Sequence, residues 1–228
     1  HKVFIERAIA TCKNTRVIVL AEACSNATSE AYDIAKFAQE IGANGILSIA
    51  PYYNNPSQDG LYQHYKTIAQ SVEIPFMLYN VPGRTGVDLL PETAIRLFDD
   101  VKNIYGIKEA TGSLERATAI ISQRENFFVF SGDDSVDFAM LASGAKGIIS
   151  VTSNLVPNLK SKLVSSVMSG DFQTALKIHN DLFELNKVLF CESNPIPIKA
   201  AMYLSGLLDS LEFRLPLTKP SNETLEKL

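Results

Sequence analysis

The sequence predicts an α/β fold, a (β/α)8 barrel followed by a helical region. Apolar runs recur through roughly the first 150 residues, and helical patterns separate them. Each run is nearly continuous in apolar residues, which is typical of parallel strands buried on both faces. Polar side chains follow the end of most runs, and barrel enzymes place their active sites at that edge.

Six of these runs are predicted to be strands. They cover residues 16–21, 44–50, 74–80, 103–108, 127–131 and 146–151. The helix expected over 29–43 has Gly42 at a position that commonly ends a helix. The helix expected over 90–101 has Pro91 in its first turn, where the missing N–H costs little.

An open doubly wound sheet is the other architecture that suits this order of elements. It is disfavoured because no glycine-rich turn follows the first run, and neither a GxGxxG nor a P-loop motif occurs. Since only six units are found, we expect a barrel that lacks its first two βα units, about sixty residues. Residues 1–14 have helical spacing without a preceding N-cap, so we expect a fragment that begins inside a helix.

The chain is expected to contain two regions. Residues 1–155 would form the partial barrel, and residues 156–228 would form a helical region. In the second region we expect a pair of helices that breaks at Gly170, with Asp171 as the N-cap of the second helix.

The composition excludes several classes of function. The formal net charge of −4 provides neither a basic surface for nucleic acid nor a polybasic membrane anchor. No apolar run is long enough to span a membrane. The three cysteines, Cys12, Cys24 and Cys191, lie far apart and indicate neither a disulfide scaffold nor a zinc site. A cytoplasmic protein is therefore the default expectation.

Lys108 is the most informative single residue. It ends the apolar strand predicted over 103–108, where an amine has no obvious structural role. Apolar neighbours such as Ile107 would desolvate the ammonium and favour the neutral amine, which can condense with a ketone to form an imine. The other interpretation is a lysine that reaches solvent or pairs with Glu109 at the rim.

The segment LYNVPGRTG supplies two partners for such chemistry. Tyr79 ends the preceding strand, and its phenol could hydrogen-bond the imine-forming oxygen and transfer protons. Arg84 could hold a carboxylate through two hydrogen bonds. Alternatively, Tyr79 is a rim aromatic residue with its hydroxyl in water.

Two further groups of residues are less specific. Tyr52 and Tyr53 are adjacent on an extended segment, so one could face the site and the other an interface, or both could be interface aromatics. His64 and His179 lie on helical patterns without a partner at metal-ligand spacing. We expect both histidines at the surface, without a functional role.

Several motifs together resemble one family. They are PYYNNPSQDGLYQHY, LYNVPGRTG, GIKEATG, FSGDDS, GIISVTSN and NPIPIKAAM. As a set they resemble the dihydrodipicolinate synthases, which condense pyruvate with L-aspartate 4-semialdehyde in lysine and diaminopimelate biosynthesis. The resemblance extends from residue 1 to about residue 221. The related N-acetylneuraminate lyases share the lysine and the tyrosine but typically lack the arginine, so VPGRTG favours the synthases.

The resemblance implies a role for each of five residues. Lys108 would form a Schiff base with pyruvate, and Tyr79 would relay protons to and from it. Tyr53 would reach across a dimer interface to complete the proton relay of a neighbouring subunit. Arg84 would bind the carboxylate of the semialdehyde, and Ile149 would lie beside the pyruvate methyl group.

The resemblance also implies assembly and regulation. Members of the family are usually homotetramers built as dimers of dimers, and lysine inhibits many bacterial members at a cleft in the dimer interface. The residues that match the lining of this cleft are His1, Asn26, Glu30 and Tyr52. No metal or organic cofactor is implied, because the imine itself acts as the electron sink.

Two features depart from the family pattern. The sequence lacks the first two strands and the Gly-Thr-Thr-Gly-Glu loop that would follow the second, and Glu22 and Cys24 stand where the family has glycines. Two other functions therefore stay open. The chain could be an inactive or non-catalytic relative, or another pyruvate-dependent class I aldolase such as a keto-sugar-acid lyase. Arg84 argues against the second of these.

Overall fold

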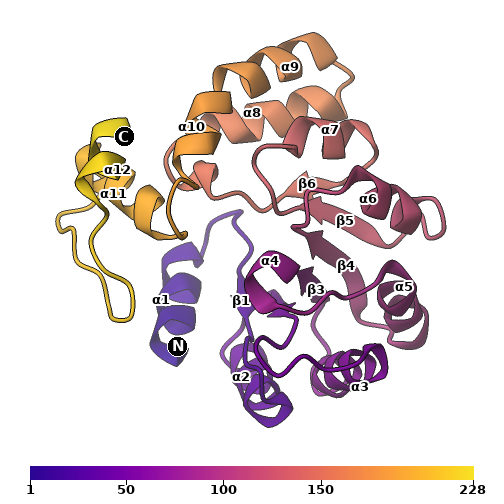
Figure 1. Cartoon of the computed structure of the whole chain (residues 1–228). Helices are drawn as coiled ribbons and strands as arrows, with labels where there is room; N and C mark the ends of the chain where they lie inside the picture. The colour runs from indigo at the N-terminus through magenta and orange to yellow at the C-terminus, as the bar shows by residue number, and fades with distance from the viewer. The chain divides into compact units, whose positions relative to one another are not determined.

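The computed structural model describes residues 1–228 as an α/β chain with one six-stranded sheet (Figure 1). The strands follow one another across the sheet in chain order, and the pairs from the first to the fourth strand are parallel. They are β1 Leu20–Glu22, β2 Gly45–Ile49, β3 Phe76–Asn80, β4 Ile104–Glu109, β5 Phe128–Ser131 and β6 Gly147–Ile148. All six predicted strands are present, and the α/β class is confirmed.

The two outer strands are shorter than expected. β1 starts at Leu20 instead of residue 16, and Val17 and Ile18 before it are 57% and 68% exposed. A strand at the edge of a sheet has a neighbour on one side only, so its apolar residues find less cover. β6 ends at Ile148 instead of residue 151, because the backbone N–H of Val151 bonds the carboxylate of Asp134 at 2.8 Å.

The chain divides into two compact units. The first comprises residues 1–130 and 144–146. Its helices are α1 Lys2–Cys12, α2 Thr28–Glu40, α3 Gln58–Ala69, α4 Pro82–Thr85, α5 Pro91–Asp100 and α6 Leu114–Ile121. Helix α2 packs on β1 and β2, α5 packs on β4, and α3 lies between α2 and α5. As predicted, Pro91 is the first residue of α5, and Gly42 follows α2 with a φ of +92°.

The expectation that His64 lies at the surface is wrong. On α3 it lies on the same face as Leu61, Tyr65 and Ile68, which are fully buried, and it is itself only 5% exposed. Its Nδ1 atom lies 2.9 Å from the Thr28 hydroxyl of α2. The histidine therefore bridges two packed helices.

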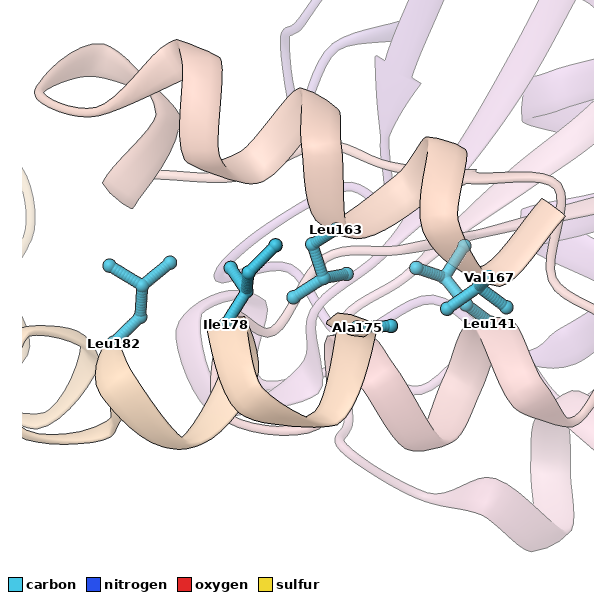
Figure 2. Packing of buried hydrophobic residues seen from close by; sticks show 6 residues of the cluster. All are labelled: Leu141, Leu163, Val167, Ala175, Ile178 and Leu182. Carbon is cyan, nitrogen blue, oxygen red and sulfur yellow. The ribbon is translucent and has the colours of Figure 1, made fainter. Parts of the chain in front are cut away.

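The second unit comprises residues 131–143 and 147–228 and is mostly helical. Besides strand β6, its elements are α7 Asp137–Ala142, the 3-10 helix η1 Thr152–Asn154, α8 Pro157–Met168, α9 Phe172–Asp181, α10 Phe183–Val188, α11 Ile196–Leu204 and α12 Asn222–Lys227. Figure 2 shows its main apolar cluster, formed by Leu141, Leu163, Val167, Ala175, Ile178 and Leu182. As predicted, the helix pair breaks around Gly170, and Asp171 accepts a hydrogen bond from the Thr174 N–H.

A buried ion cluster joins helix α7, the loop before it and helix α8. The Lys160 ammonium on α8 lies 2.7 Å from Asp134 and 2.6 Å from Asp137, and all three side chains are almost fully buried. On α9, His179 is half-buried with its ring 5.9 Å from that of Phe138, so the expected surface position is wrong here too. None of the helices is both long and apolar enough to cross a lipid bilayer.

Candidate active site

Lys108 and Tyr79 lie side by side on neighbouring strands. Tyr79 of β3 is the direct register partner of Lys108 of β4. The Lys108 Nζ atom lies 4.0 Å from the centre of the Tyr79 ring, and both residues are half-buried. An amine and a phenol at this separation can act on the same bound carbonyl group.

The sheet places further residues in the same row. Ile49 of β2 pairs with Tyr79, and its backbone N–H bonds the Cys24 sulfur at 3.4 Å just beyond β1. One row therefore runs across four neighbouring strands at the same level of the sheet and contains Cys24, Ile49, Tyr79 and Lys108. Because side chains alternate along a strand, Glu22 projects from the same face as this row.

The opposite face of β4 carries a separate polar network. Glu109 is fully buried there and accepts hydrogen bonds from Arg116 at 3.4 Å, from Asn80 at 3.4 Å and from the Thr111 N–H at 2.9 Å. Arg116 also contacts Asp88 at 3.0 Å. This network anchors the end of β4 from behind, and its arginine neutralises the buried carboxylate.

Burial and nearby charges keep two acidic groups of the site protonated at neutral pH. Burial, and then the negative charge of Glu22, raise the pKa of Tyr79 to about 12, whereas Arg84 acts in the opposite direction. Burial and Glu22 likewise raise the pKa of the Cys24 thiol, and the charge of Lys108 opposes them. Tyr79 is thus available as a proton donor.

Arg84 lies in the short helix α4 directly after β3 and is exposed. Gly86 ends this helix with a φ of +75°, a conformation that favours glycine. The Tyr53 N–H bonds the Thr85 carbonyl oxygen at 3.2 Å, so the loop after β2 lies against α4. Tyr53 itself has a φ of +76° and is 87% exposed, and its ring therefore points into solvent.

Ile149 belongs to the second unit. It follows β6 directly, is half-buried, and donates its N–H to the Ser131 carbonyl oxygen at 2.7 Å.

The four residues predicted to line an effector cleft all lie near the segment 22–30 or belong to it. The His1 ring bonds the Glu22 carbonyl oxygen at 2.8 Å, and the Ser25 hydroxyl donates to Glu30 at 2.7 Å. The Asn26 carbonyl oxygen accepts from Asn54, which in turn bonds the Tyr52 carbonyl oxygen. His1 also lines a cavity of about 460 Å³, and Glu22 lies at the same cavity.

The prediction from sequence missed Arg116, the residue that neutralises Glu109. One signal was present: Glu109 ends an apolar strand, a buried carboxylate requires a cation, and Arg116 is the first basic residue after it. The sequence also did not reveal the Lys160 cluster. No group of three or more histidine, cysteine, aspartate or glutamate side chains in the structure could hold a metal ion.

The chain is similar to known proteins over its whole length. The model of the "Dihydrodipicolinate synthetase family" matches residues 1–228. A "4-hydroxy-tetrahydrodipicolinate synthase" of Aliarcobacter butzleri (strain RM4018) is 81% identical over 228 residues, which are 100% of this chain and 77% of the relative. The protein with the same name from Sulfurovum sp. (strain NBC37-1) is 61% identical with the same coverage of both chains.

Solved structures agree with these relatives. The crystal structure of dihydrodipicolinate synthase from Aquifex aeolicus has a TM-score of 0.96 and 44% identity, and covers 100% of this chain and 77% of its own. The dihydrodipicolinate synthase from Acinetobacter baumannii, crystallised in complex with pyruvate, has a TM-score of 0.95 and 44% identity, with coverage of 99% and 77%. Since a family model, close relatives and solved structures all extend over the whole row of strands that holds Lys108 and Tyr79, the chain belongs to the dihydrodipicolinate synthetase family.

Proposed function

We propose that this chain condenses pyruvate with L-aspartate 4-semialdehyde to 4-hydroxy-tetrahydrodipicolinate, and that Lys108 is the amine that binds pyruvate. The observation that carries the proposal is the contact between Lys108 and Tyr79, with the amine 4.0 Å from the ring centre on adjacent strands. The relatives that bear the name of this activity support it. The reaction serves lysine and diaminopimelate biosynthesis.

The first step joins the Lys108 nitrogen to the keto carbon of pyruvate. Addition gives a carbinolamine, and loss of its hydroxyl group as water, with a proton from Tyr79, gives the protonated imine. The positive nitrogen then withdraws electrons from the methyl carbon, which loses a proton and becomes the nucleophilic carbon of an enamine. The raised pKa of Tyr79 suits this donor role, because the phenol keeps its proton at neutral pH.

The second step joins the enamine carbon to the aldehyde carbon of the semialdehyde. Arg84 is exposed at the end of β3 and holds the carboxylate of this substrate. The amine of the adduct then attacks the imine carbon, and the bond to Lys108 breaks, which closes the ring and frees the enzyme. No metal or organic cofactor takes part in this scheme.

The remaining assignments are part of the same proposal. Ile149 borders the pyruvate methyl group, and Tyr53, with its exposed ring, acts across an interface between two copies in a homo-oligomer. His1, Asn26, Glu30 and Tyr52 form a lysine effector site. The six-stranded sheet represents six of the eight units of a (β/α)8 barrel.

Reductive trapping tests the first step. Incubation with pyruvate and borohydride should add one reduced pyruvate to the peptide that contains Lys108, detected by mass spectrometry. The variant Lys108→Met should show no adduct, whereas Lys102→Met, at an exposed position just before β4, should be labelled like the wild type. An unmodified Lys108 peptide in the wild type would refute the proposal.

Substrate choice tests the second step. Arg84→Ala should leave pyruvate trapping intact but raise the KM for the semialdehyde by on the order of tenfold or more, since a charge-assisted hydrogen bond contributes about 1.5–3 kcal/mol. The comparison of semialdehyde with sugar aldehydes in steady-state assays distinguishes the synthase from a keto-sugar-acid lyase. Faster turnover with sugar aldehydes would assign the chain to the latter class.

A further inference from the structure

One carboxylate projects from the same face of the sheet as the reactive amine. Glu22, the last residue of β1, pairs with Leu47 of β2, and Leu47 pairs with Met77 of β3. Tyr79 lies two residues after Met77 on the same strand. Residues two apart on a strand share a face, so Glu22 stands one row before the row that holds Tyr79 and Lys108.

Cys24 connects the two rows. Its sulfur accepts the Ile49 N–H at 3.4 Å, which places it in register with Ile49, and Ile49 pairs with Tyr79. Cys24 is two residues after Glu22, so the two side chains are neighbours on that face. The charge of Glu22 and the charge of Lys108 act on the Cys24 thiol in opposite directions.

The effect of Glu22 reaches the reacting groups. Its negative charge contributes to the raised pKa of Tyr79, whereas the charge of Arg84 acts against it. The Glu22 side chain is exposed, so its field passes partly through water and is sensitive to salt. A keto acid that forms an imine on Lys108 must bring its own carboxylate into this field.

We propose that Glu22 is a specificity-determining residue, whose charge disfavours anionic keto acids at Lys108 relative to uncharged ketones of the same shape. This inference rests on the proposed function, since it requires imine formation at Lys108. Repulsion between the two carboxylates weakens capture of the anion, while a neutral keto ester escapes this repulsion. Arg84 offsets the effect without removing it, since at Tyr79 the influence of Glu22 exceeds that of Arg84.

A pair of matched probes tests the inference. Pyruvate is an anion, and methyl pyruvate is its neutral ester. With excess cyanoborohydride, so that imine formation limits the rate, the adduct at Lys108 is followed by mass spectrometry for both probes. The ratio of the pyruvate rate to the methyl pyruvate rate reports the charge effect, because a general change in the reactivity of the amine cancels in it.

We expect Glu22→Gln to raise this ratio by about twofold at low ionic strength, because Glu22 on β1 and Lys108 on β4 are three strand spacings apart, about 14 Å along the sheet, and a unit charge acts only weakly over that separation. The gain should shrink in about 1 M salt, where the Debye length is about 3 Å. Glu22→Asp retains the charge and should keep the wild-type ratio. Glu125→Gln, at an exposed position between α6 and β5, should also leave the ratio unchanged.

Two results overturn the inference. An unchanged ratio in Glu22→Gln at low salt would show that the carboxylate does not act on the substrate. An increase that persists in high salt would indicate a change of shape instead of charge. Adduct formation at Lys108 in either case leaves the proposed function intact, whereas the absence of adducts with both probes in every variant refutes the proposed function and the inference together.

Discussion

The phenol of Tyr79 has the properties of a proton donor rather than a phenolate. Burial and the nearby Glu22 raise its pKa to about 12, so it remains protonated through the physiological range. The group next to it is the amine of Lys108, whose attack on a ketone generates a hydroxyl that must leave as water. The residue therefore combines the correct position with the correct protonation state.

The variant Tyr79→Phe removes this proton and keeps the ring beside Lys108. We expect imine formation with pyruvate to slow by on the order of 100-fold or more, which is the usual contribution of a positioned acid. Rapid-quench trapping followed by mass spectrometry measures the rate. The matched change Tyr105→Phe, on β4 with its ring against Phe130, should leave the rate unchanged. Equal rates in both variants would exclude Tyr79 as the donor.

At the scale of single elements, the two faces of strand β4 have different roles. One face presents Lys108, and the other buries Glu109 against Arg116 of α6. Removal of one member of a buried pair leaves the other charge without compensation, and this costs more than the pair itself contributes. The anchor behind the strand therefore also fixes the position of the amine in front of it.

We expect Arg116→Ala to lower the free energy of unfolding by about 3–5 kcal/mol, because Glu109 would stay buried without a cation. The exposed pair of Arg124 and Asp99 supplies the control, since Arg124→Ala should have a far smaller effect. Urea unfolding followed by circular dichroism measures both changes. Similar losses in the two variants would contradict the assigned importance of the buried network.

The buried residue His64 of helix α3 makes the free energy of unfolding depend on pH. Burial lowers its pKa from 6.5 to about 4, so the folded state binds fewer protons than the unfolded state between these values. His64 therefore does not reduce the free energy of unfolding above about pH 6.5. As the pH falls toward 4, protonation of His64 in the unfolded state lowers the free energy of unfolding by up to about 3 kcal/mol. His64→Gln should remove this part of the decline, as urea unfolding at pH 7 and pH 4.5 can show. An identical decline in the variant would assign the acid sensitivity to other groups.

The interiors of the six strands and of several helices could be predicted from the sequence, but the ends of the two outer strands could not. Continuous apolar runs locate buried strands, and the glycine, proline and aspartate positions locate several helix ends. The start of β1 depends on tertiary packing, which leaves Val17 and Ile18 exposed, and the end of β6 depends on Asp134, which lies 17 residues before Val151. Such partners are tertiary facts that no local pattern contains.

The candidate active site could likewise be predicted only in part from the sequence. Parallel strands bring their carboxyl ends to one edge, so the nearness of Tyr79 and Lys108 follows from the order of the strands. Their direct pairing depends on the register between β3 and β4, which includes an irregularity between Phe76 and Met77. The side of α3 on which His64 falls depends on the packing against α2. Both features arise from tertiary packing and not from any local sequence pattern.

At the scale of the whole molecule, the second of the two units has an apolar cluster that is formed by its own residues alone. In the second unit, Leu163 of α8 is 1% exposed within the cluster of Figure 2. Leu163→Ala should lower the free energy of unfolding by about 2–5 kcal/mol, the usual cost of a cavity in a packed core. Leu159→Ala on the same helix, where the leucine is 41% exposed, should cost only about 0.5 kcal/mol. Urea denaturation of both variants measures the difference, and equal costs would argue against a packed core at α8.

The path of the backbone between the units has a practical consequence. The chain passes from the first unit to the second after residue 130, returns for residues 144–146, and then leaves again. A scission after residue 130, which separates all helices of the second unit from the first, also removes the Lys146 N–H that bonds the Val129 carbonyl oxygen at 2.8 Å. Because residues 144–146 belong to the first unit and residues 131–143 to the second, neither unit corresponds to one uninterrupted stretch of the polypeptide, and a gene that encodes either unit complete and alone has to be rejoined or permuted.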